Sequence, residues 1–397
     1  MPALPSLRAA GKVRPRPAGG TALADLPSRL LVTGARAPVA AHLVRLLGES
    51  GHHVETADSI APSLAGASRY SAAFHPLPSP RHAPGAAAAR LEAICRAGGL
   101  GMILPTCEEV FHLAALRERG LLSVPVLAPP LAALLAVHDK GRFAELLARL
   151  GLPHPVTRRL EGAGDLEGLD PRSLVLKPCF SRFGEAVRVR PARIDIAPTP
   201  AQPWVAQDFV AGEEFSVVAL ARAGRVTALC AYRAGWRTGR HGAGLCCEAV
   251  DAGGVRALAE GVAGALDWEG FLSFDTIRRA DGVHVAIECN PRPVTGLHFF
   301  RDPVAFRAAL AGAEGCLAAD ATGPQAMKLA LWAYGLGRGN PLRLWRDSRR
   351  ATGFLDWPGD PGPGRAQLAV FAAFARRALR QRVSLTRATV EDIAWDG

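Results

Sequence analysis

The sequence predicts a mixed α/β (α+β) protein with a parallel sheet in its N-terminal part, and two segments carry this prediction. Residues 29–57 run from an apolar stretch through Gly34 into a long Ala- and Leu-rich stretch and then a second apolar stretch, the strand–helix–strand order of an α/β unit. Residues 271–292 hold two alternating segments around Asp281-Gly282, the strongest short signal for a β-hairpin. The chain of 397 residues is long enough for roughly two or three domains.

The succession of such segments predicts the domain organisation. Residues 1–28 are rich in Ala, Pro and Arg with little periodicity, so we expect a disordered tail. We expect an N-terminal α/β domain over 29–130 and a second domain over 131–325. The remaining part, 326–397, is expected to be a C-terminal helical segment.

The N-terminal domain should contain further strands where apolar runs end in polar or proline-containing segments, at 99–109 and 121–127. Gly34 is a single glycine where a dinucleotide fingerprint needs G-x-G-x-x-G, so a Rossmann reductase or epimerase is a weaker interpretation. Next, a helix over about 138–150 should end at Gly151.

The middle of the chain consists of short strand patterns and turns. Residues 174–178 should form a strand stopped by proline, with 185–190 as its hairpin partner. Residues 204–214 should form a strand that runs into a turn, followed by a hairpin over 214–232 around Ala223-Gly224.

The C-terminal segment carries two helical stretches with a Pro/Gly-rich break at 358–364. Its ending, 389–397, is compatible with either a docking segment or a lid, and the sequence does not choose between them.

Charge and cysteine content narrow the partners and the compartment. The net charge is +11, but the densest basic clusters form no aromatic-interleaved nucleic-acid motif, so we expect no nucleic-acid partner. Those clusters are Arg343, Arg346, Arg349 and Arg350, and then Arg376, Arg377, Arg380 and Arg382. No apolar run reaches the ~18 residues of a membrane span, so we expect no membrane partner. The eight cysteines form no C-x-x-C pair, which favours a reducing cytoplasm, with Cys179 and Cys289 as inert side chains.

The predicted hairpin of residues 271–292 places acidic side chains opposite each other. If Ala280 pairs with Val283 across the turn, Asp275 faces Glu288, and Asn290 shares the face of Glu288. Opposed carboxylates repel unless a cation lies between them. Two carboxylates and an amide oxygen are ligands that suit Mg²⁺ or Mn²⁺. The alternative is a hairpin whose polar residues face water.

Lysine is rare in this chain, which makes its positions informative. Only Lys12, Lys140, Lys177 and Lys328 occur among 47 basic residues. Lys177 ends a predicted strand just before a short loop that holds Ser181 and Gly184, and the backbone amides of such a loop can bind phosphate. Lys140 opens a predicted helix after His138-Asp139. Lysine and arginine are not equivalent at a phosphate site, so these two lysines are candidate phosphate ligands.

Five segments in this order together resemble the ATP-grasp superfamily over about residues 100–300. They are His138-Asp-Lys140, Val175-Leu-Lys-Pro178, Gln207-Asp-Phe-Val-Ala-Gly-Glu-Glu214, Asp275, and Glu288-Cys-Asn-Pro-Arg292. The resemblance implies an ATP-grasp fold in which the N-terminal α/β unit is the pre-ATP-grasp domain. Residues 131–325 would then be the ATP-grasp domain, with about 170–208 as its small lid subdomain. It also implies ATP and Mg²⁺ (or Mn²⁺) as cofactors.

The resemblance implies a role for each matching residue. Lys140 and Lys177 would contact ATP phosphates, with Ser181 and Gly184 in the phosphate loop. The nucleotide would lie against Gln207, Asp208, Phe209 and Val210, and Glu214, or else Glu213, would bind the ribose. Asp275, Glu288 and Asn290 would hold the metal. Arg292, together with Lys177, would act on the reacting phosphate or intermediate.

Three departures from the family pattern refine this expectation. The phosphate loop has one glycine where many relatives have several, and Gln207 stands where a glutamate is frequent. Gly296 stands where biotin-carboxylase-like members have a basic glutamate, which disfavours carboxylation with bicarbonate. The sequence is closer to the amino-acid and peptide ligases, including relatives of D-alanine–D-alanine ligase and the carbamoyl-phosphate-synthase-like group.

The implied function is an ATP-dependent carboxylate–amine ligase of cytoplasmic location that acts on small molecules, with a homodimer as an option. The alternatives are a kinase or other phosphoryl-transfer enzyme of the same superfamily and a non-catalytic nucleotide-binding regulator. Candidate substrate residues are Arg233, Arg237 and Arg240, in or beside a glycine-rich segment, and His298 past the metal strand. For each of them a purely solvated or structural role is an equal alternative.

Overall fold

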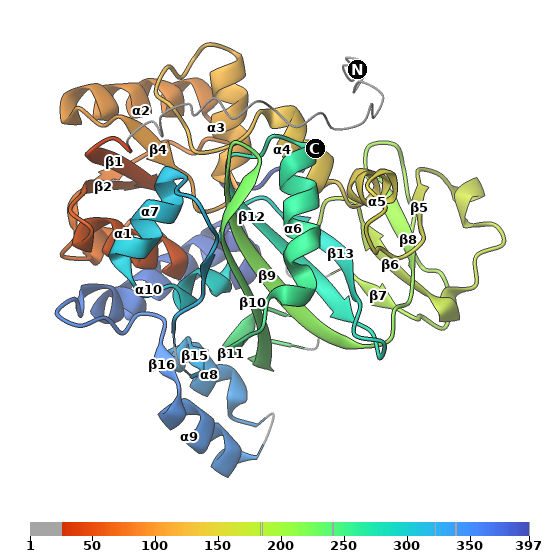
Figure 1. The fold of residues 1–397 in the computed structure, drawn as a ribbon. Helices are drawn as coiled ribbons and strands as arrows, with labels where there is room; N and C mark the ends of the chain where they lie inside the picture. The colour runs from red at the N-terminus through yellow and green to blue at the C-terminus, as the bar shows by residue number, and fades with distance from the viewer. Residues whose placement is uncertain are drawn as a thin grey trace.

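The structure is a computed structural model that describes residues 26–182, 184, 186–239, 242–321, 323–337 and 340–396. Most of the expected N-terminal tail and the candidate substrate residue Arg240 lie outside these residues. Three sheets organise the described chain, and Figure 1 shows them side by side.

The N-terminal sheet is entirely parallel, as the sequence predicts. Its strand order is β3 (Ser71–Pro76), β2 (His53–Asp58), β1 (Arg29–Thr33) and β4 (Met102–Leu104). The helices of this part are α1 (Pro38–Glu49), η1 (Ala65–Ala67), α2 (Pro84–Gly98) and α3 (Glu109–Glu118). The prediction of a strand at 121–127 is wrong, because only an isolated bridge from Val126 to Ile103 forms there.

A small antiparallel sheet follows the helix pair α4 (Leu131–His138) and α5 (Lys140–Arg149). Its strand order is β5 (Thr157–Leu160), β8 (Trp204–Asp208), β6 (Leu174–Pro178) and β7 (Arg188–Val189), with η2 (Ala163–Leu166) and η3 (Pro171–Ser173) in its loops. The hairpin predicted for β6 and β7 forms, with Val175 opposite Val189. We call these four strands the small sheet.

The large sheet has eight strands and forms the centre of the molecule. Its main path is β13 (His284–Asn290), β12 (Gly270–Arg278), β9 (Glu213–Arg222), β10 (Arg225–Arg237), β11 (Gly244–Val250), β15 (Gln325–Ala326) and β16 (Thr352–Gly353), with β14 (Leu317–Ala318) beside β10. The other elements are α6 (Gly253–Ala265), η4 (Thr295–Phe299), α7 (Pro303–Ala311), α8 (Lys328–Gly335), α9 (Pro341–Arg350), α10 (Gly362–Gln381) and α11 (Leu385–Ala388). The C-terminal segment is therefore not purely helical, because β15 and β16 extend this sheet.

Strand β9 shows why the large sheet lies inside the molecule. Its odd-numbered residues, such as Val217 and Ala219, belong to one core cluster with α6, and its even-numbered residues Val218 and Leu220 belong to another with η4 and α7. Side chains alternate between the two faces of a strand, so a strand covered on both faces is apolar without interruption. At the start of β10, Ala223 and Gly224 form the predicted turn, with φ of 49° and 73°.

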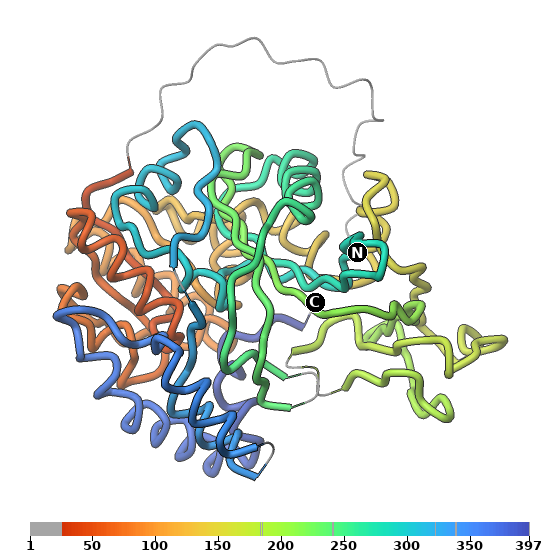
Figure 2. Tube along the Cα trace, turned by 60° about the horizontal axis from the view of Figure 1, so that its bottom comes forward, coloured from red at the N-terminus to blue at the C-terminus, as the bar shows by residue number. Residues whose placement is uncertain are grey.

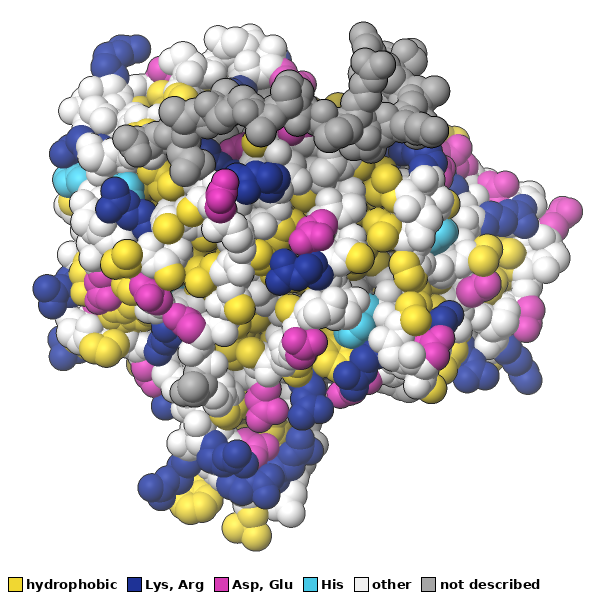
Figure 3. All heavy atoms as spheres, in the orientation of Figure 1, with side chains coloured by type: hydrophobic (Ala, Val, Ile, Leu, Met, Phe, Trp, Pro, Cys, Tyr) yellow, Lys and Arg dark blue, Asp and Glu magenta, His cyan; other side chains and the backbone are white. Residues whose placement is uncertain are grey.

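The C-terminal helices add a basic surface. Figure 3 shows dark blue side chains gathered over the projection formed by α8 and α9, where α9 carries four arginines. In the part of the chain that is described, no helix combines the length and apolarity needed to cross a membrane.

Candidate active site

The turn of the β12–β13 hairpin differs from the prediction, yet the predicted pairing of its acidic residues is right. Ala280 does not pair with Val283; instead Arg279 N donates to Val283 O (2.9 Å), and Arg278 pairs with His284. The loop is thus one residue longer. A shift in register between Asp275 and Thr276 restores the alignment, so Asp275 does face Glu288. Asn290 lies two residues farther along β13, opposite Ser273.

The neighbouring strand orients Asp275. Ser216 of β9 pairs with Asp275, and its hydroxyl donates a 2.7 Å hydrogen bond to Asp275 Oδ1. Three adjacent strands therefore contribute to one polar site on the large sheet.

Two lysines approach this site from different elements. Asp139 caps α5 by accepting hydrogen bonds from Gly141 N and Arg142 N, so the expected helix over 138–150 begins only at Lys140. The Lys140 Nζ lies 3.6 Å from Glu288 Oε2. Lys177 lies on β6 of the small sheet, is only 6% exposed, and interacts electrostatically with Glu288 and Asp275.

Burial sets the protonation of these groups. Burial and the nearby Glu288 carboxylate raise the pKa of Asp275 to about 6. Burial acts to raise the pKa of Glu288 as well, but Lys140 and Lys177 outweigh it, and the net shift is downward. Burial, assisted by Lys140, lowers the pKa of Lys177 to about 8 in spite of the attraction of Glu288.

The donor set fits a hard divalent cation. Asp275 and Glu288 are opposed carboxylates, and burial together with the Glu288 charge raises the pKa of Asp275, a shift that a bound cation would oppose. Among the described residues, no group of three or more His, Cys, Asp and Glu side chains is arranged to hold a metal. The predicted set has only two carboxylates, so a metal there would depend on the amide oxygen of Asn290 and on non-protein oxygens.

Arg292 lies in the loop that follows β13. Its Nη2 is 3.5 Å from Asn290 Oδ1, and its backbone N–H donates to Asn290 O (2.8 Å). Ser273 Oγ donates to the carbonyl oxygen of Arg292 (2.7 Å) and fixes this turn. The Arg292 charge contributes to the lowered pKa of Glu288, which places the guanidinium in the same electrostatic field as the two lysines.

The segment expected to border the nucleotide begins on β8. Gln207 is buried, and its Nε2 donates to Thr157 Oγ1 of β5 (3.2 Å). Asp208 ends the strand as an exposed residue, Val210 is partly buried, and Phe209 is 39% exposed with Arg190 over its ring at 5.2 Å. An exposed aromatic ring at this position offers a flat apolar surface to a heterocycle.

Glu214 and Arg237 form an ion pair of 3.0 Å beside the acidic site, and the Arg237 charge counteracts the raised pKa of Asp275. Arg233 points elsewhere: it lies near Glu213 (3.3 Å) and Glu248 (3.5 Å) and lines a cavity of about 500 Å³ together with arginines of α9. The structure thus brings Arg237 to the site but not Arg233.

His298 does not line an accessible site. It is 1% exposed, its ring stacks on Phe354 (4.4 Å, 8°), and it meets His42 edge-on at 4.8 Å. Burial holds the pKa of His298 well below its usual range. His298 follows β13 closely in the sequence, but η4 turns its side chain into the core.

The loop after β6 contains Ser181, which is partly buried, and Gly184, whose φ of +67° is the left-handed conformation that glycine adopts readily. Arg182 between them is held by other parts of the chain. Cys179, just before the loop, is a buried thiol whose pKa burial raises to about 12, consistent with an inert side chain.

Sequence reasoning missed two partners in the site. Ser216 lies two residues after Glu214 and therefore on the same face of β9, which is a signal that the cross-strand register contains. The pairing of Asp139 with Arg159 Nη1 (2.8 Å), which ties the cap of α5 to β5, leaves no signal in the sequence.

Comparisons with known proteins agree with this architecture. Residues 137–296 match a family model described as an ATP-grasp domain. An L-amino acid ligase from Bacillus licheniformis superposes with a TM-score of 0.55 at 19% identity, over 72% of this chain and 75% of that chain. A search of curated proteins gives no significant match.

Two further solved structures share the fold. An N5-carboxyaminoimidazole synthetase from Staphylococcus aureus complexed with ADP gives a TM-score of 0.58 at 12% identity, over 76% of this chain and 81% of that chain. A phosphoribosylamine–glycine ligase from Thermotoga maritima gives 0.57 at 16% identity, over 75% and 78%. At these identities the likeness concerns the fold, and it agrees with the ATP-grasp domain matched over residues 137–296.

Proposed function

We propose that this protein is an ATP- and Mg²⁺-dependent ligase that activates a small carboxylate as an acyl-phosphate, which an amine then attacks. One observation carries the proposal: two buried lysines, from α5 and β6, share an electrostatic site with the opposed carboxylates of β12 and β13. Buried charges are costly unless they are paired or bind a ligand. A site with this charge pattern suits a metal–triphosphate complex.

The chain's own residues would divide the work as follows. Lys140 and Lys177 would bind phosphate oxygens, and Phe209 would cover one side of the base. Asp275, Glu288 and Asn290 would hold Mg²⁺, which would neutralise phosphate charge and orient the terminal phosphate. Arg292 would stabilise charge on the phosphate in transfer and then on the tetrahedral adduct formed by the amine. No side chain of the protein needs to act as a nucleophile.

Gly296 supports a ligase rather than a bicarbonate-dependent carboxylase. A Cβ atom at this position would lie 2.6 Å from Val218 Cγ1 and 2.9 Å from the Tyr232 ring. No larger residue fits here without displacing buried side chains, so a basic glutamate is excluded at this position.

The test is a screen of amino acids and small acids, singly and in pairs, for phosphate release from Mg·ATP by the full-length protein. A ligase releases phosphate and forms an amide only when both substrates are present, and hydroxylamine traps its acyl-phosphate as a hydroxamate. A phosphorylated acid that persists without an amine would identify a kinase instead. Nucleotide binding without turnover of any pair would identify a regulator.

Variants link the activity to the site. We expect Asp275→Asn and Lys177→Met to lose turnover by on the order of a hundredfold or more, since each removes a charge that acts on the transferred phosphate. Lys328→Met is the matched control, because Lys328 is an exposed lysine that pairs with Asp356, and neither residue belongs to the proposed site. Equal activity in all three variants would refute the assignment of the site.

A further inference from the structure

The last described residues, 391–396, lie between the N-terminal sheet and the loop that follows β6. Figure 2 shows the end of the chain between the body of the molecule and the small sheet. This placement answers a question that the sequence leaves open, because the segment touches the loop predicted to bind phosphate.

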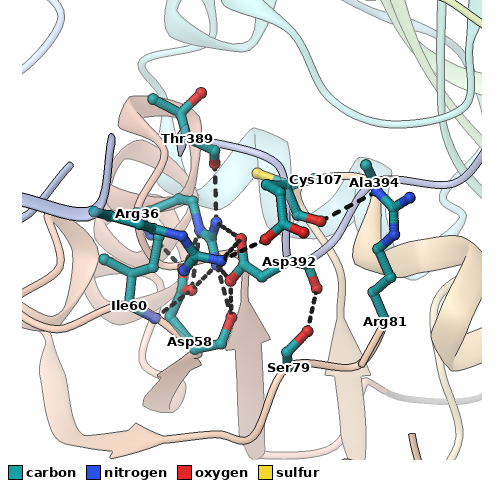
Figure 4. A network of polar contacts seen from close by, with 12 residues as sticks. Arg36, Asp58, Ile60, Ser79, Arg81, Cys107, Thr389, Asp392 and Ala394 are labelled. Atoms are coloured by element: carbon teal, nitrogen blue, oxygen red, sulfur yellow. Dashed lines mark hydrogen bonds and ion pairs between the residues drawn. The ribbon is translucent and has the colours of Figure 1, made fainter. Parts of the chain in front are cut away.

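Asp392 anchors the segment to the N-terminal sheet (Figure 4). Its two carboxylate oxygens each accept a 2.8 Å hydrogen bond from Arg36, which also binds Asp58 at the end of β2. The carbonyl oxygen of Asp392 accepts a 2.7 Å hydrogen bond from Ser79 Oγ. Burial acts to raise the pKa of Asp392, but Arg36 outweighs it and lowers the pKa to about 2. The anchor is therefore a permanently charged, buried pair.

Trp395 forms a second anchor. Its ring stacks on Phe111 of α3 (5.9 Å, 23°) and meets His112 edge-on at 5.0 Å. Its backbone N–H donates to Glu108 Oε2 (3.3 Å), and its carbonyl oxygen lies 3.4 Å from His138 Nε2.

These anchors hold Arg182. Its Nε donates to Glu108 Oε2 (2.5 Å), its Nη1 to Asp396 Oδ1 (2.7 Å) and its Nη2 to the Trp395 carbonyl oxygen (2.5 Å). Burial acts to lower the pKa of Arg182, but Glu108 and Asp396 outweigh it and raise the pKa. All three guanidinium nitrogens therefore donate to Glu108 or to the C-terminal segment.

We propose that residues 391–396 position the loop that carries Ser181 and follows Lys177, and that they do so through their hydrogen bonds to Arg182. Arg182, Trp395 and Asp396 are positioning residues, and the inference rests on the proposed nucleotide site. A loop fixed before nucleotide arrives does not have to be ordered by it, which improves affinity without any new contact to the ligand. The positioning residues should thus act on the KM for ATP more than on kcat.

The experiment uses the full chain without nucleotide and a Trp395→Ala/Asp396→Ala double variant. Trypsin cleaves after arginine, so the rate of cleavage after Arg182 reports directly on how firmly the loop is held. We expect cleavage to accelerate at least about tenfold and the KM for ATP to rise on the order of tenfold, with kcat within about twofold of the wild type. Asp281→Ala is the matched control, because it removes an exposed ion pair with Arg279 in the hairpin turn.

Unchanged cleavage after Arg182 in the double variant would overturn the inference, whatever its activity. If the double variant loses its cooperative unfolding transition, Asp396→Asn alone serves, with a smaller acceleration expected and no acceleration contradicting the grip. Arg182→Lys keeps the charge and the cleavage site but loses the planar fork, so it should resemble the double variant. Failure of the wild type to bind ATP would refute the proposed function, whereas the cleavage assay would still decide the role of the segment.

Discussion

The charge of the buried Lys177 should destabilise the folded protein when neither nucleotide nor metal is bound. Its pKa falls from 10.5 to about 8 because burial penalises the ammonium group more than Glu288 and Asp275 attract it. One pKa unit corresponds to about 1.4 kcal/mol, so the charged side chain costs about 3 kcal/mol of folding free energy at pH 7. Replacing Lys177 with methionine, an unbranched apolar residue, should raise the free energy of unfolding by about that amount.

The pH dependence gives the prediction its sign. Between pH 8 and pH 10.5 the unfolded chain keeps a proton on Lys177 that the folded chain has released, so the stability of the wild type rises with pH across this window. The stability of the Lys177→Met protein lacks this pH dependence, because methionine does not titrate. The gap between the two should therefore shrink from about 3 kcal/mol at pH 7 to about 1.4 kcal/mol at pH 9.5.

Urea denaturation of the metal-free and nucleotide-free proteins at both pH values measures this gap. Lys328→Met is the control, because the Lys328 side chain is 43% exposed and its ion pair with Asp356 is worth at most about 1 kcal/mol. A Lys177→Met protein that is no more stable than the wild type at pH 7, or a gap that does not shrink at pH 9.5, would refute the reasoning.

Three further predictions test other parts of the structure. Between pH 3.8 and about 6 the folded protein holds a proton on Asp275 that the unfolded chain has lost, so the stability that this proton contributes is lost as pH rises through 6. At pH 7 the charged Asp275 therefore destabilises the metal-free protein, and Asp275→Asn should raise its free energy of unfolding by about 3 kcal/mol in urea denaturation. Asp392→Ala leaves the buried Arg36 with Asp58 as its remaining carboxylate partner and should lower the free energy of unfolding by about 3–5 kcal/mol. Gly212→Ala places a Cβ atom 2.2 Å from the Arg278 carbonyl oxygen and should cost about 1–3 kcal/mol, measured by the same denaturation.

Each of these has a contrary outcome. Mn²⁺ binding, followed by electron paramagnetic resonance, should weaken below pH 6 in the wild type, and a flat profile would contradict the raised pKa of Asp275. Asp281→Ala should leave the free energy of unfolding nearly unchanged, so a cost equal to that of Asp392→Ala would contradict the importance of burial. Gly85→Ala in α2 is the control for Gly212, since nothing lies within 4 Å of its Cβ position, and it should stabilise rather than destabilise.

The sequence predicted the hairpin and the facing of Asp275 and Glu288 because both depend on short-range rules, namely turn composition and the alternation of side chains. The predicted turn was one residue too short, and the register shift beside Asp275 corrected it. A bulge of this kind depends on how β12 packs between β9 and β13, which no local pattern reveals.

The positions of the remaining site residues could not be predicted from the sequence, because long-range contacts determine them. His298 follows β13 in sequence, but the packing of η4 against Phe354 and His42 buries it. Arg182 lies between Ser181 and Gly184 of the predicted phosphate loop, and only the folded chain shows its bonds to Glu108 and to the C-terminal segment.

By itself, the sequence determined the fold class, the parallel N-terminal sheet, the acidic hairpin and the two scarce lysines, because periodicity and residue chemistry are local properties. Only the tertiary structure decided which charges are buried together and how strongly they shift one another's pKa values. It alone brought Arg36 to Asp392 and Arg182 to Asp396. Burial and electrostatic coupling depend on distances in space, and residues separated by hundreds of positions carry no mark of their proximity in the order of the chain.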